Sequence, residues 1–456
     1  MKTELHNYDI YPKVIPVGKE SEITVKPLGW HAQFKNGVNY KLKICPFNEG
    51  SPRDYPNRKN LFEYDVSPDP DGCIRFKFGF FAEQQYYIRI TDGDRFRIQL
   101  SVYAVDKDLC GRYPFKGDLH MHSRYSDGQQ SPEIVCANYR KTGYDFLALT
   151  DHNRYYPSLA AIDAYKSVPI EFNIVPGEEI HLPNDYKNNH INDIHIVNFG
   201  GKYSINALVE GAHLKEVGDD RLKRSVDGIC PDTMTTEEYW AMIDEYAKTL
   251  DIPDNIEKFA YAACHWIFAE IRKANGLGIF CHPYWISDVF QIPPEIVDYM
   301  MQMQPFDAFE VLGGENYFEQ NGLQTIQYYE DIAKGYKYPI VGSTDSHNSV
   351  NNRNSHLCYT VVFSSENERE ALISSIKDFY SIAVDTISIE PRFVGELRLV
   401  KYACFLEQEF FPLHDDLCYE EGRAMKDYVC GISGAKEMLE CISGRMKAQR
   451  EKYFGF

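Results

Sequence analysis

The stretch KGDLHMHSRYSDG, residues 116–128, places two histidines two positions apart in a short extended segment, and an aspartate follows in a turn. Side chains two apart in a strand face the same side, so His120 and His122 point together. Such a pair is either half of a metal site or two hydrogen-bonded core histidines. The rest of the chain has to decide between these interpretations.

The composition is that of a globular protein with more than one domain. Its 456 residues predict two or three domains, and 44% hydrophobic and 25% charged residues are typical of soluble chains. The start, MKTELHNYDIYPK, lacks the apolar segment of a signal peptide, and no apolar run approaches the length of a membrane span. We therefore expect a cytoplasmic protein without a membrane partner.

Charge and cysteine usage exclude further classes of protein. A formal net charge of −19 without a basic run predicts no nucleic-acid partner, because phosphate affinity comes mainly from clustered Lys and Arg. The 12 cysteines form no CxxC pair and have no regular spacing. We therefore expect neither a disulfide framework nor a thiolate zinc site.

Residues 1–112 are predicted to form an N-terminal β-sandwich domain. Segments with alternating apolar residues, such as SEITVKPL, NYKLKICPF and CIRFKFGFF, are separated by turn-rich pieces such as SPDPDG and TDGD. No catalytic constellation occurs in them, so the expected roles are packing, substrate access or assembly.

Residues 113–395 are predicted to form an α/β barrel. Seven apolar runs end in polar residues: GDLHMH, FLALTDH, FNIVPGEE, IHIVNFG, GIFCHP, AFEVLGG and IVGSTDSH. A helix is predicted after the first run, with Ser131 as its N-cap and Gly143 as its stop. Repeated strand and helix units indicate a mainly parallel sheet, and seven strands suggest a closed or nearly closed barrel.

The carboxyl ends of barrel strands meet at one face, so side chains far apart in the sequence can form one site there. Six histidines are too many for a core, because each buried imidazole needs its own partners. Imidazole and carboxylate donors suit zinc, iron or manganese, and such a set can hold two or three ions. The predicted metal ligands are His120, His122, Asp127, His152, Glu179, His195, His282, Asp345 and His347.

The motifs DLHMHSRYSDG, LTDHN, PGEEIH, IHIVNFG, CHP and GSTDSH together resemble the PHP (polymerase and histidinol phosphatase) family of metal-dependent phosphoesterases. The resemblance covers residues 113–348 and implies a distorted seven-stranded β/α barrel with a trinuclear centre. It implies one ion held by His120, His122, Glu179 and Asp345, a second by Glu179, His195 and His282, and a third by Asp127, His152 and His347.

Several neighbouring residues have more than one interpretation. In GEE, the family spacing Gly-x-Glu selects Glu179 over Glu178. His181 could face the same cavity as a catalytic or substrate-binding residue, or could play a supporting or surface role. Asp151 is either a helper or a turn aspartate. Cys281 is expected to point to the opposite side of its strand and to pack.

Two segments are predicted to decorate the barrel. Residues 200–255 exceed the length of one barrel connection, so we expect an inserted lid over the metals, with simple decoration as the alternative. Residues 396–456 form a predicted C-terminal helical extension, which is expected to dock on its own chain, or on a second copy in a homodimer.

The predicted activity is hydrolysis of a small-molecule phosphoester by a hydroxide bound to the metals, with His120, His122, Asp345 and His181 as catalytic residues. The motif CHPYW departs from the family, because Trp285 stands where PHP phosphatases commonly carry a phosphate-binding arginine. Arg124, Arg154 and Lys202 are the cations that could replace it.

This departure leaves two alternatives open, namely a hydrolase of carboxylic or carbamic esters and a non-catalytic metal-binding module. Aromatic residues that follow the ligands suit a substrate with a flat organic portion, or else pack the lid against the barrel. The predicted substrate-binding residues are Arg124, Tyr155, Tyr156, Tyr284 and Trp285.

Overall fold

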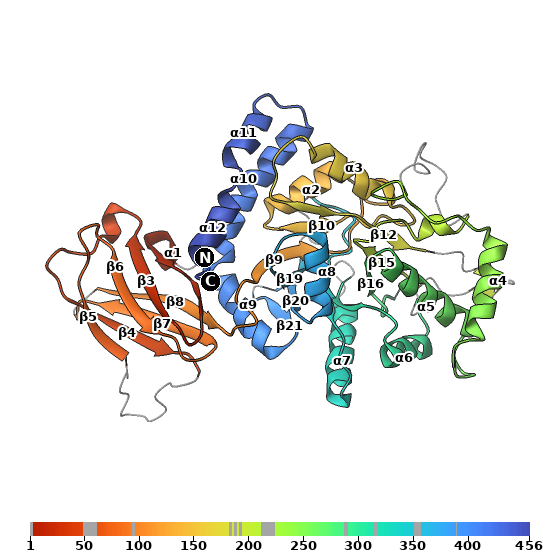
Figure 1. Cartoon of the computed structure of the whole chain (residues 1–456), viewed down its shortest axis with the longest axis horizontal. Coiled ribbons are helices and arrows are strands. Elements are labelled where there is room, and N and C mark those ends of the chain that lie inside the picture. Colours follow the sequence, from red (N-terminus) through yellow and green to blue (C-terminus); the bar gives the residue numbers. More distant parts are fainter. Residues whose placement is uncertain are drawn as a thin grey trace. The chain divides into compact units, whose positions relative to one another are not determined.

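The computed structural model describes two compact units, each of which contains segments distant in the sequence (Figure 1). The described residues are 3–48, 62–93, 96–181, 185–186, 189–190, 194–210, 224–286, 291–313, 318–350, 357–388 and 390–456. The first unit comprises residues 1–113, 397–417 and 444–456, and the second comprises residues 114–396 and 418–443.

The first unit contains two sheets that enclose one core. The smaller sheet has the order β1 (Tyr8–Tyr11), β3 (Glu20–Pro27) and β6 (Ile74–Gly79). The larger has the order β2 (Val14–Pro16), β8 (Arg97–Val105), β7 (Gln84–Thr91), β4 (Tyr40–Pro46) and β5 (Phe62–Val66). Ile23 and Val25 from the first sheet and Leu42 and Ile88 from the second belong to the same buried cluster. Apolar side chains of both sheets therefore pack against one another, as the inner faces of a β-sandwich do.

Short helices and C-terminal helices complete the first unit. They are α1 (Thr3–Asn7), η1 (Trp30–Ala32), α9 (Leu397–Glu409), the start of α10 (Phe411–Val429) and α12 (Arg445–Tyr453). Tyr402 on α9 packs its ring 4.9 Å from that of Tyr103 on β8. The hydroxyl of Tyr453 donates to Asp9 at 3.1 Å. The predicted extension 396–456 is helical, and its residues are divided between the two units.

The second unit contains two large sheets and a two-stranded one. The six-stranded sheet has the order β11 (Asn173–Val175), β10 (Phe146–Ala148), β9 (Tyr113–Asp118), β19 (Cys358–Ser364), β20 (Ser381–Asp385) and β21 (Arg392–Val394). The five-stranded sheet has the order β12 (Gly177–Ile180), β15 (Ile196–Phe199), β16 (Leu277–Phe280), β17 (Ala308–Leu312) and β18 (Ile340–Gly342). The small sheet pairs β13 (Asp185–Tyr186) with β14 (Asn189–His190).

These sheets do not form the predicted closed, mainly parallel barrel of seven strands. Strands β9, β10 and β11 are parallel, and so are β16, β17 and β18, whereas β12, β15 and β16 are antiparallel. For β12 and β15 the physical reason is that antiparallel neighbours need no crossover helix, and the described residues between these two strands contain none. Isolated bridges join Met121 to Ser346, beyond β9 and β18, and His152, beyond β10, to Glu179 within β12.

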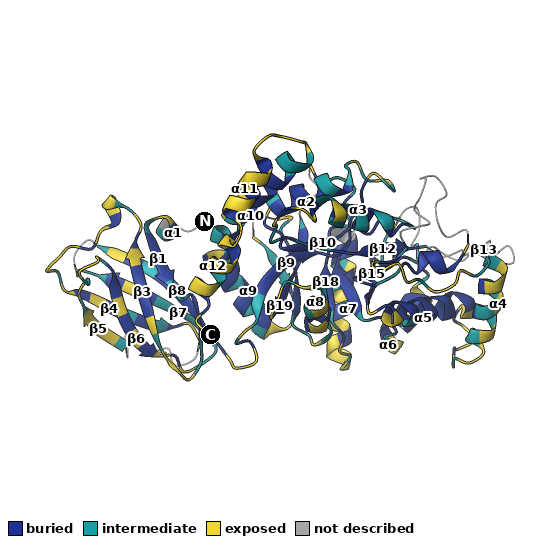
Figure 2. Ribbon diagram, turned by 45° about the horizontal axis from the view of Figure 1, so that its top comes forward, coloured by how far each residue is buried: buried dark blue, intermediate teal, exposed yellow. Residues whose placement is uncertain are grey.

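Several strands of the second unit, β10, β12, β15, β16 and β17, are buried along their length (Figure 2). Its helices are α2 (Pro132–Lys141), α3 (Tyr156–Tyr165), α4 (Thr236–Ala247), α5 (Lys258–Lys273), α6 (Pro294–Met303), α7 (Phe318–Lys334), α8 (Arg369–Lys377), the rest of α10, and α11 (Ala435–Ile442), with the 3-10 turn η2 (Asn206–Leu208). Helix α2 follows Ser131 as predicted, although the Ser131 hydroxyl donates to Glu133 and does not cap the helix.

Within the predicted lid, α4 begins with a capping box formed by Thr235 and Glu238. Residues 211–223 of that segment lie outside the described residues. No helix among the described residues is long and apolar enough to cross a membrane.

Arg140 on α2 is fully buried and links three parts of the second unit. Its guanidinium donates to Glu421 on α10, to the Asp145 carboxylate at 3.1 Å and to the Tyr144 carbonyl at 2.8 Å. A charge removed from water is stable only when such partners replace its hydration. This cluster therefore fixes α2, which follows the loop that carries the first two histidines.

We predict that Arg140→Met lowers the free energy of unfolding by about 3–5 kcal/mol, because two buried carboxylates lose their cation. Urea denaturation followed by circular dichroism measures the change. Arg75→Met is the matched control, since Arg75 forms exposed ion pairs with Asp69 and Asp71 and its loss should change stability little. Similar small effects of both substitutions would contradict the prediction.

Candidate metal centre

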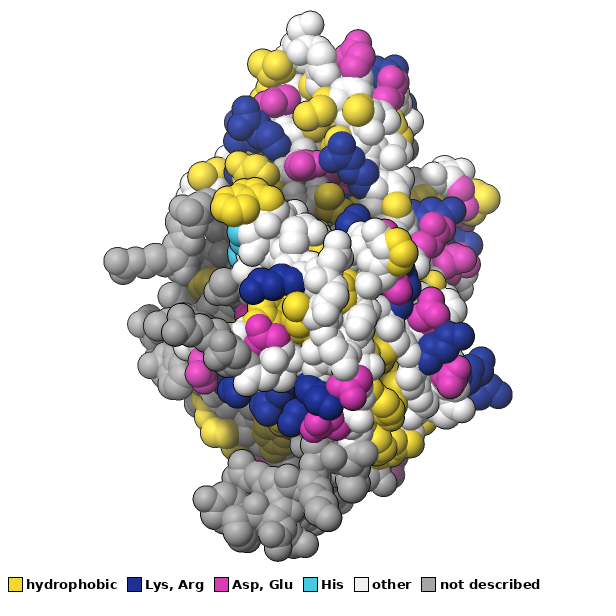
Figure 3. All heavy atoms as spheres, turned by 90° about the vertical axis from the view of Figure 1, so that its left-hand side faces the viewer, with side chains coloured by type: hydrophobic (Ala, Val, Ile, Leu, Met, Phe, Trp, Pro, Cys, Tyr) yellow, Lys and Arg dark blue, Asp and Glu magenta, His cyan; other side chains and the backbone are white. Residues whose placement is uncertain are grey.

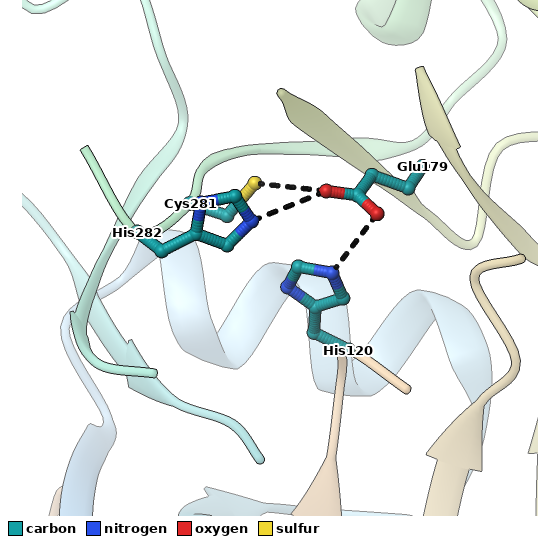
Figure 4. A group of neighbouring side chains, drawn as sticks. All are labelled: His120, Glu179, Cys281 and His282. Atoms are coloured by element: carbon teal, nitrogen blue, oxygen red, sulfur yellow. Dashed lines mark hydrogen bonds and ion pairs between the residues drawn. The ribbon is translucent and has the colours of Figure 1, made fainter. Parts of the chain in front are cut away.

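Glu179 lies at the centre of the predicted site. It is fully buried on β12, and its carboxylate faces imidazoles from several strand ends. The Oε1 atom lies 2.8 Å from His195 Nδ1 and 3.2 Å from His282 Nε2. The Oε2 atom lies 3.4 Å from both His120 Nε2 and His122 Nε2. Figure 4 shows His120 and His282 on two sides of this carboxylate.

Asp345 adds a second carboxylate beside the first two histidines. Its Oδ1 atom lies 2.9 Å from His122 Nε2 and 3.3 Å from His120 Nε2. The φ angle of Asp345 is +50°, and that of His282 is +28°. Residues with a Cβ rarely adopt these angles, so two residues that face the centre have strained backbones.

Asp127, His152 and His347 form a neighbouring group. Asp127 Oδ2 lies 3.2 Å from His347 Nε2 and 3.5 Å from His152 Nε2. The ring of His122 stacks 4.3 Å from each of the two imidazoles. His122 therefore lies between the Asp345 carboxylate and this group. All nine predicted ligands are brought together by the structure.

Three buried polar atoms at the centre have no hydrogen-bond partner in the structure: His120 Nε2, Glu179 Oε2 and His195 Nδ1. Each is a potential metal ligand, and each lies within 3.4 Å of another potential ligand. Buried polar atoms that lack a hydrogen bond are costly, and a bound ion would supply the missing interaction. Imidazole and carboxylate donors that face one another fit divalent transition-metal ions.

The pKa values show how strongly these groups interact. Burial tends to raise the pKa of the Glu179 carboxyl, but attraction to the imidazoles of His152, His195 and His120 holds it well below its usual range. Burial lowers the pKa of His122 and of His195 to about 3. These two imidazoles are therefore neutral at pH 7, which is the form that binds metal ions.

Burial also tends to lower the pKa of His152, but the carboxylates of Glu179 and Asp127 outweigh it and raise this pKa to about 10. In the chain alone, His152 therefore carries a positive charge at neutral pH. A bound dication would replace this proton as the positive charge beside the carboxylates, because the proton and the metal compete for the same imidazole nitrogen.

Glu310 is a site residue that the sequence prediction missed. It is fully buried on β17, and its Oε2 atom lies 3.0 Å from His120 Nδ1. An ionised carboxylate accepts the Nδ1–H of the imidazole, so the lone pair of His120 Nε2 faces Glu179 and Asp345. The signal in the sequence was a single glutamate inside the apolar run AFEVLGG.

Glu178 and Asp151 support the site and do not face it. Glu178 accepts hydrogen bonds from Ser204 Oγ, the Ile205 amide and the Asn198 and Asn206 side chains. This set fixes the opposite face of β12, so Glu179 is the glutamate that faces the other ligands. Asp151 accepts hydrogen bonds from the amides and hydroxyls of Ser123 and Ser126, which orders the loop between His122 and Asp127.

The expectation for Cys281 is wrong. Its Sγ atom lies 3.9 Å from Glu179 Oε1, on the side of the centre and not on the opposite side (Figure 4). The reason is that β16 ends at Phe280 and the backbone turns at His282, so the alternation of a strand no longer applies. Burial raises the pKa of the Cys281 thiol well above its usual value, which favours the neutral form.

The predicted substrate residues differ in their exposure. Tyr155 is buried, and its hydroxyl donates to the Gly201 carbonyl at 2.6 Å, so this hydroxyl already has a partner within the chain and a substrate contact of Tyr155 stays a prediction. Tyr284 is half-buried and donates to Gln327 at 2.9 Å. Trp285 is half-buried, with its ring 6.1 Å from that of His282.

The ring of Tyr156 packs edge-on against that of Tyr125, at 5.8 Å. Arg124 is exposed, and Lys202 is half-buried. Arg154 is 5% exposed, and its Nε atom is buried without a hydrogen-bond partner. Among the described residues, no carboxylate forms an ion pair with the Arg154 guanidinium.

We predict that Glu310→Gln weakens zinc binding by about 10–100-fold, because His120 loses the charged partner that fixes its tautomer. The fold should persist, since the amide has the same shape as the carboxylic acid. Competition titration with a chelator measures the affinity. Glu245→Gln, at an exposed glutamate paired with Lys248, is the control and should leave the affinity unchanged. Equal affinities of the two variants would show that Glu310 does not act on the metals.

Comparison with known proteins identifies several similar chains. The DNA polymerase/3'-5' exonuclease PolX of Bacillus subtilis (strain 168) is 39% identical over 57 residues, which are 12% of this chain and 10% of that protein. A two-domain protein containing a predicted PHP-like metal-dependent phosphoesterase from Bacteroides vulgatus ATCC 8482 shares 19% identity, with a TM-score of 0.39 over 65% of this chain and 71% of that one. Endonuclease Q, solved with a 27-mer duplex substrate, shares 12% identity, with a TM-score of 0.31 over 58% of this chain and 57% of that one.

The prediction that the chain has no nucleic-acid partner is therefore wrong as an exclusion, because 57 of its residues are similar to PolX, a DNA polymerase/3'-5' exonuclease. A net charge of −19 sums the whole chain, whereas phosphate binding depends on the charge around one site. On the face in Figure 3, acidic and basic side chains are interspersed, so the acidic excess does not form one continuous surface there.

A family model supports the resemblance that the motifs indicated. The PHP domain model matches residues 118–251, which include His120, His122, Asp127, His152, Glu179 and His195. His282, Asp345 and His347 lie further along the second unit, where the structure brings them to the same centre. The resemblance to the PHP family is thereby confirmed, with the PHP domain model matching residues 118–251.

Proposed function

We propose that the protein is a metal-dependent hydrolase of a small-molecule phosphoester. The observation that carries the proposal is the convergence of imidazoles on the buried carboxylates of Glu179 and Asp345. Zinc, manganese or iron would be held by three sets, of which the first two share Glu179: His120, His122, Glu179 and Asp345; Glu179, His195 and His282; and Asp127, His152 and His347. When bound, such ions lower the pKa of water and stabilise charge that develops on the ester oxygens.

Residues around these ligands position them for this role. Glu310 orients His120, and the Thr150 hydroxyl accepts the Met121 amide at 3.0 Å between the two histidines of the first motif. The amide of Asp345 donates to the His120 carbonyl at 2.9 Å. The backbone and the side chains of these ligands are thus held in place by these hydrogen bonds, so the ligands need little rearrangement when an ion binds.

Arg154 supports a substrate that carries a phosphate. Its guanidinium is almost fully buried, lies two residues beyond His152 and has no ion-pair partner among the described residues. A buried cation without a counterion is unfavourable, and binding of an anion would relieve that cost. A guanidinium is also suited to bidentate contact with a phosphoryl group. It could thereby replace the arginine that is absent at Trp285.

A carboxylic or carbamic aryl ester is the second candidate substrate. The observation that favours it is the position of Trp285, a half-buried aromatic ring next to the His282 imidazole. A flat apolar group can pack against such a ring while the ester reaches the metals. The two candidates share the metal centre and differ in the group that the protein recognises.

We predict that protein loaded with zinc or manganese hydrolyses at least one ester in a panel of phosphomonoesters, phosphodiesters, aryl carboxylic esters, carbamates and an abasic DNA duplex. Release of phosphate, phenol or cleaved strand is measured. Glu179→Gln should reduce turnover by more than about 100-fold, because the carboxylate shared by several ligands is lost. Glu245→Gln should retain full activity. Absence of turnover across the panel with metals bound would overturn the proposal.

We also predict that Trp285→Ala distinguishes the two candidate substrates. If the ring binds an aryl group, kcat/KM should fall by about 10-fold or more for an aryl ester, because a stacked aromatic contact contributes about 0.5–1.5 kcal/mol beyond the area it buries. Turnover of an aliphatic ester and the metal content should remain unchanged. Equal losses for both esters would show that Trp285 supports the fold and does not select the substrate.

A further inference from the structure

His181 lies among the potential ligands but belongs to none of the three sets that the family resemblance implies. Its Nε2 atom lies 2.9 Å from His152 Nδ1 and 3.8 Å from Glu179 Oε2. The ring centroids of His181 and His195 are 3.8 Å apart. One ligand atom from each of His152, Glu179, His181 and His195 lies within 4.8 Å of the others, a spacing that can accommodate one ion.

The backbone at His181 is fixed in place. Its amide donates to Asn206 Oδ1 at 3.2 Å, and Asn206 Nδ2 donates to Glu178 Oε2 at 3.0 Å and to the Glu179 carbonyl at 3.1 Å. Asn206 is fully buried and begins η2. The end of β12 is therefore tied to the segment that follows β15, so His181 does not reach the cluster through a free loop.

His152 presents its two nitrogens to two different groups. Nε2 faces Asp127 at 3.5 Å, whereas Nδ1 faces Glu179 Oε2 at 2.6 Å and His181 Nε2. When His152 binds an ion through Nε2, its Nδ1–H can donate to Glu179, and the Nε2 lone pair of His181 is left without that partner. The His181 lone pair then remains available to an ion on the Glu179 side.

We propose that His181 Nε2 is a metal ligand, which binds the ion shared by Glu179 and His195. This inference rests on the proposed function, because it concerns the same centre. The His181 side chain is 23% exposed, compared with 8% for His195 and none for Glu179. His181 would thus bind this ion from the more exposed side of the cluster, and it belongs to none of the three ligand sets that the family resemblance implies.

The test is cobalt binding by the full chain with His181→Gln. Glutamine can still accept a hydrogen bond from His152 Nδ1, but it is a far weaker cobalt ligand than imidazole. We expect the affinity for one ion to fall by more than about 100-fold, beyond the 10–100-fold that loss of an indirect partner costs. The visible absorption of that cobalt ion should also change, because absorption reports its ligands. The other ions should bind as before.

Two further variants keep the result interpretable. His265→Gln is the control, since His265 on α5 is half-buried and bonded to Tyr246, and it should leave cobalt binding unchanged. In His181→Ala, added imidazole should restore the lost ion and its absorption. An unchanged ion count, affinity and spectrum in His181→Gln would overturn the inference.

Cobalt binding is measured without turnover, so this inference and the proposed function can fail separately. A wild-type chain that binds cobalt with the His181-dependent spectrum but hydrolyses no ester supports the ligand role and overturns the proposed function. If the protein hydrolyses esters but the cobalt spectra of His181→Gln and the wild-type chain are identical, only the ligand role is overturned. A wild-type chain that binds no cobalt overturns the ligand role as well.

Discussion

The second unit depends on a carboxylate that has been removed completely from water. Glu179 is fully buried, and an isolated charge in that position would be prohibitively unfavourable. It is tolerated because imidazoles from four separate strand ends and loops surround it, among them those of His120, His152, His195 and His282. The strands must therefore end at one place, and the mixed direction of the sheets matters less than this common end.

The positions of the other ligands follow from the same constraint. The two isolated bridges, Met121 to Ser346 and His152 to Glu179, lie where ligand-bearing segments leave their strands. They tie the two large sheets of the second unit together at the level of the centre. The positive φ angles of His282 and Asp345 show that the chain accepts local strain to aim both side chains inward. Strain of this kind persists only where the surroundings fix the backbone.

Much of the candidate site could be predicted from the sequence, because its residues follow apolar runs that end in His, Asp or Glu. The choice of Glu179 over Glu178 came from the family spacing Gly-x-Glu, and strand alternation then sends the two side chains to opposite faces. The same rule failed for Cys281, because the strand ends one residue before it and the backbone turns at His282. The burial of Tyr155 depends on a hydrogen bond to a distant carbonyl, which no local pattern reports. The prediction of a closed barrel was wrong for a similar reason: the direction of each strand depends on how the connecting segments pack, which no local pattern reports.

The carboxylates that surround the centre also determine the sign and strength of its electrostatic field. Three predicted ligands, Asp127, Glu179 and Asp345, are carboxylates, and Glu310 adds a fourth through its contact with His120. If the remaining ligands are neutral imidazoles, two divalent ions would leave the centre about neutral, and three would leave about two positive charges. The number of ions would therefore decide whether the centre attracts an anionic ester, whatever the charge of the whole chain. A sum over the sequence cannot reveal this, because Glu310 counts as one acid among 67 Asp and Glu residues and only its position makes it part of the site.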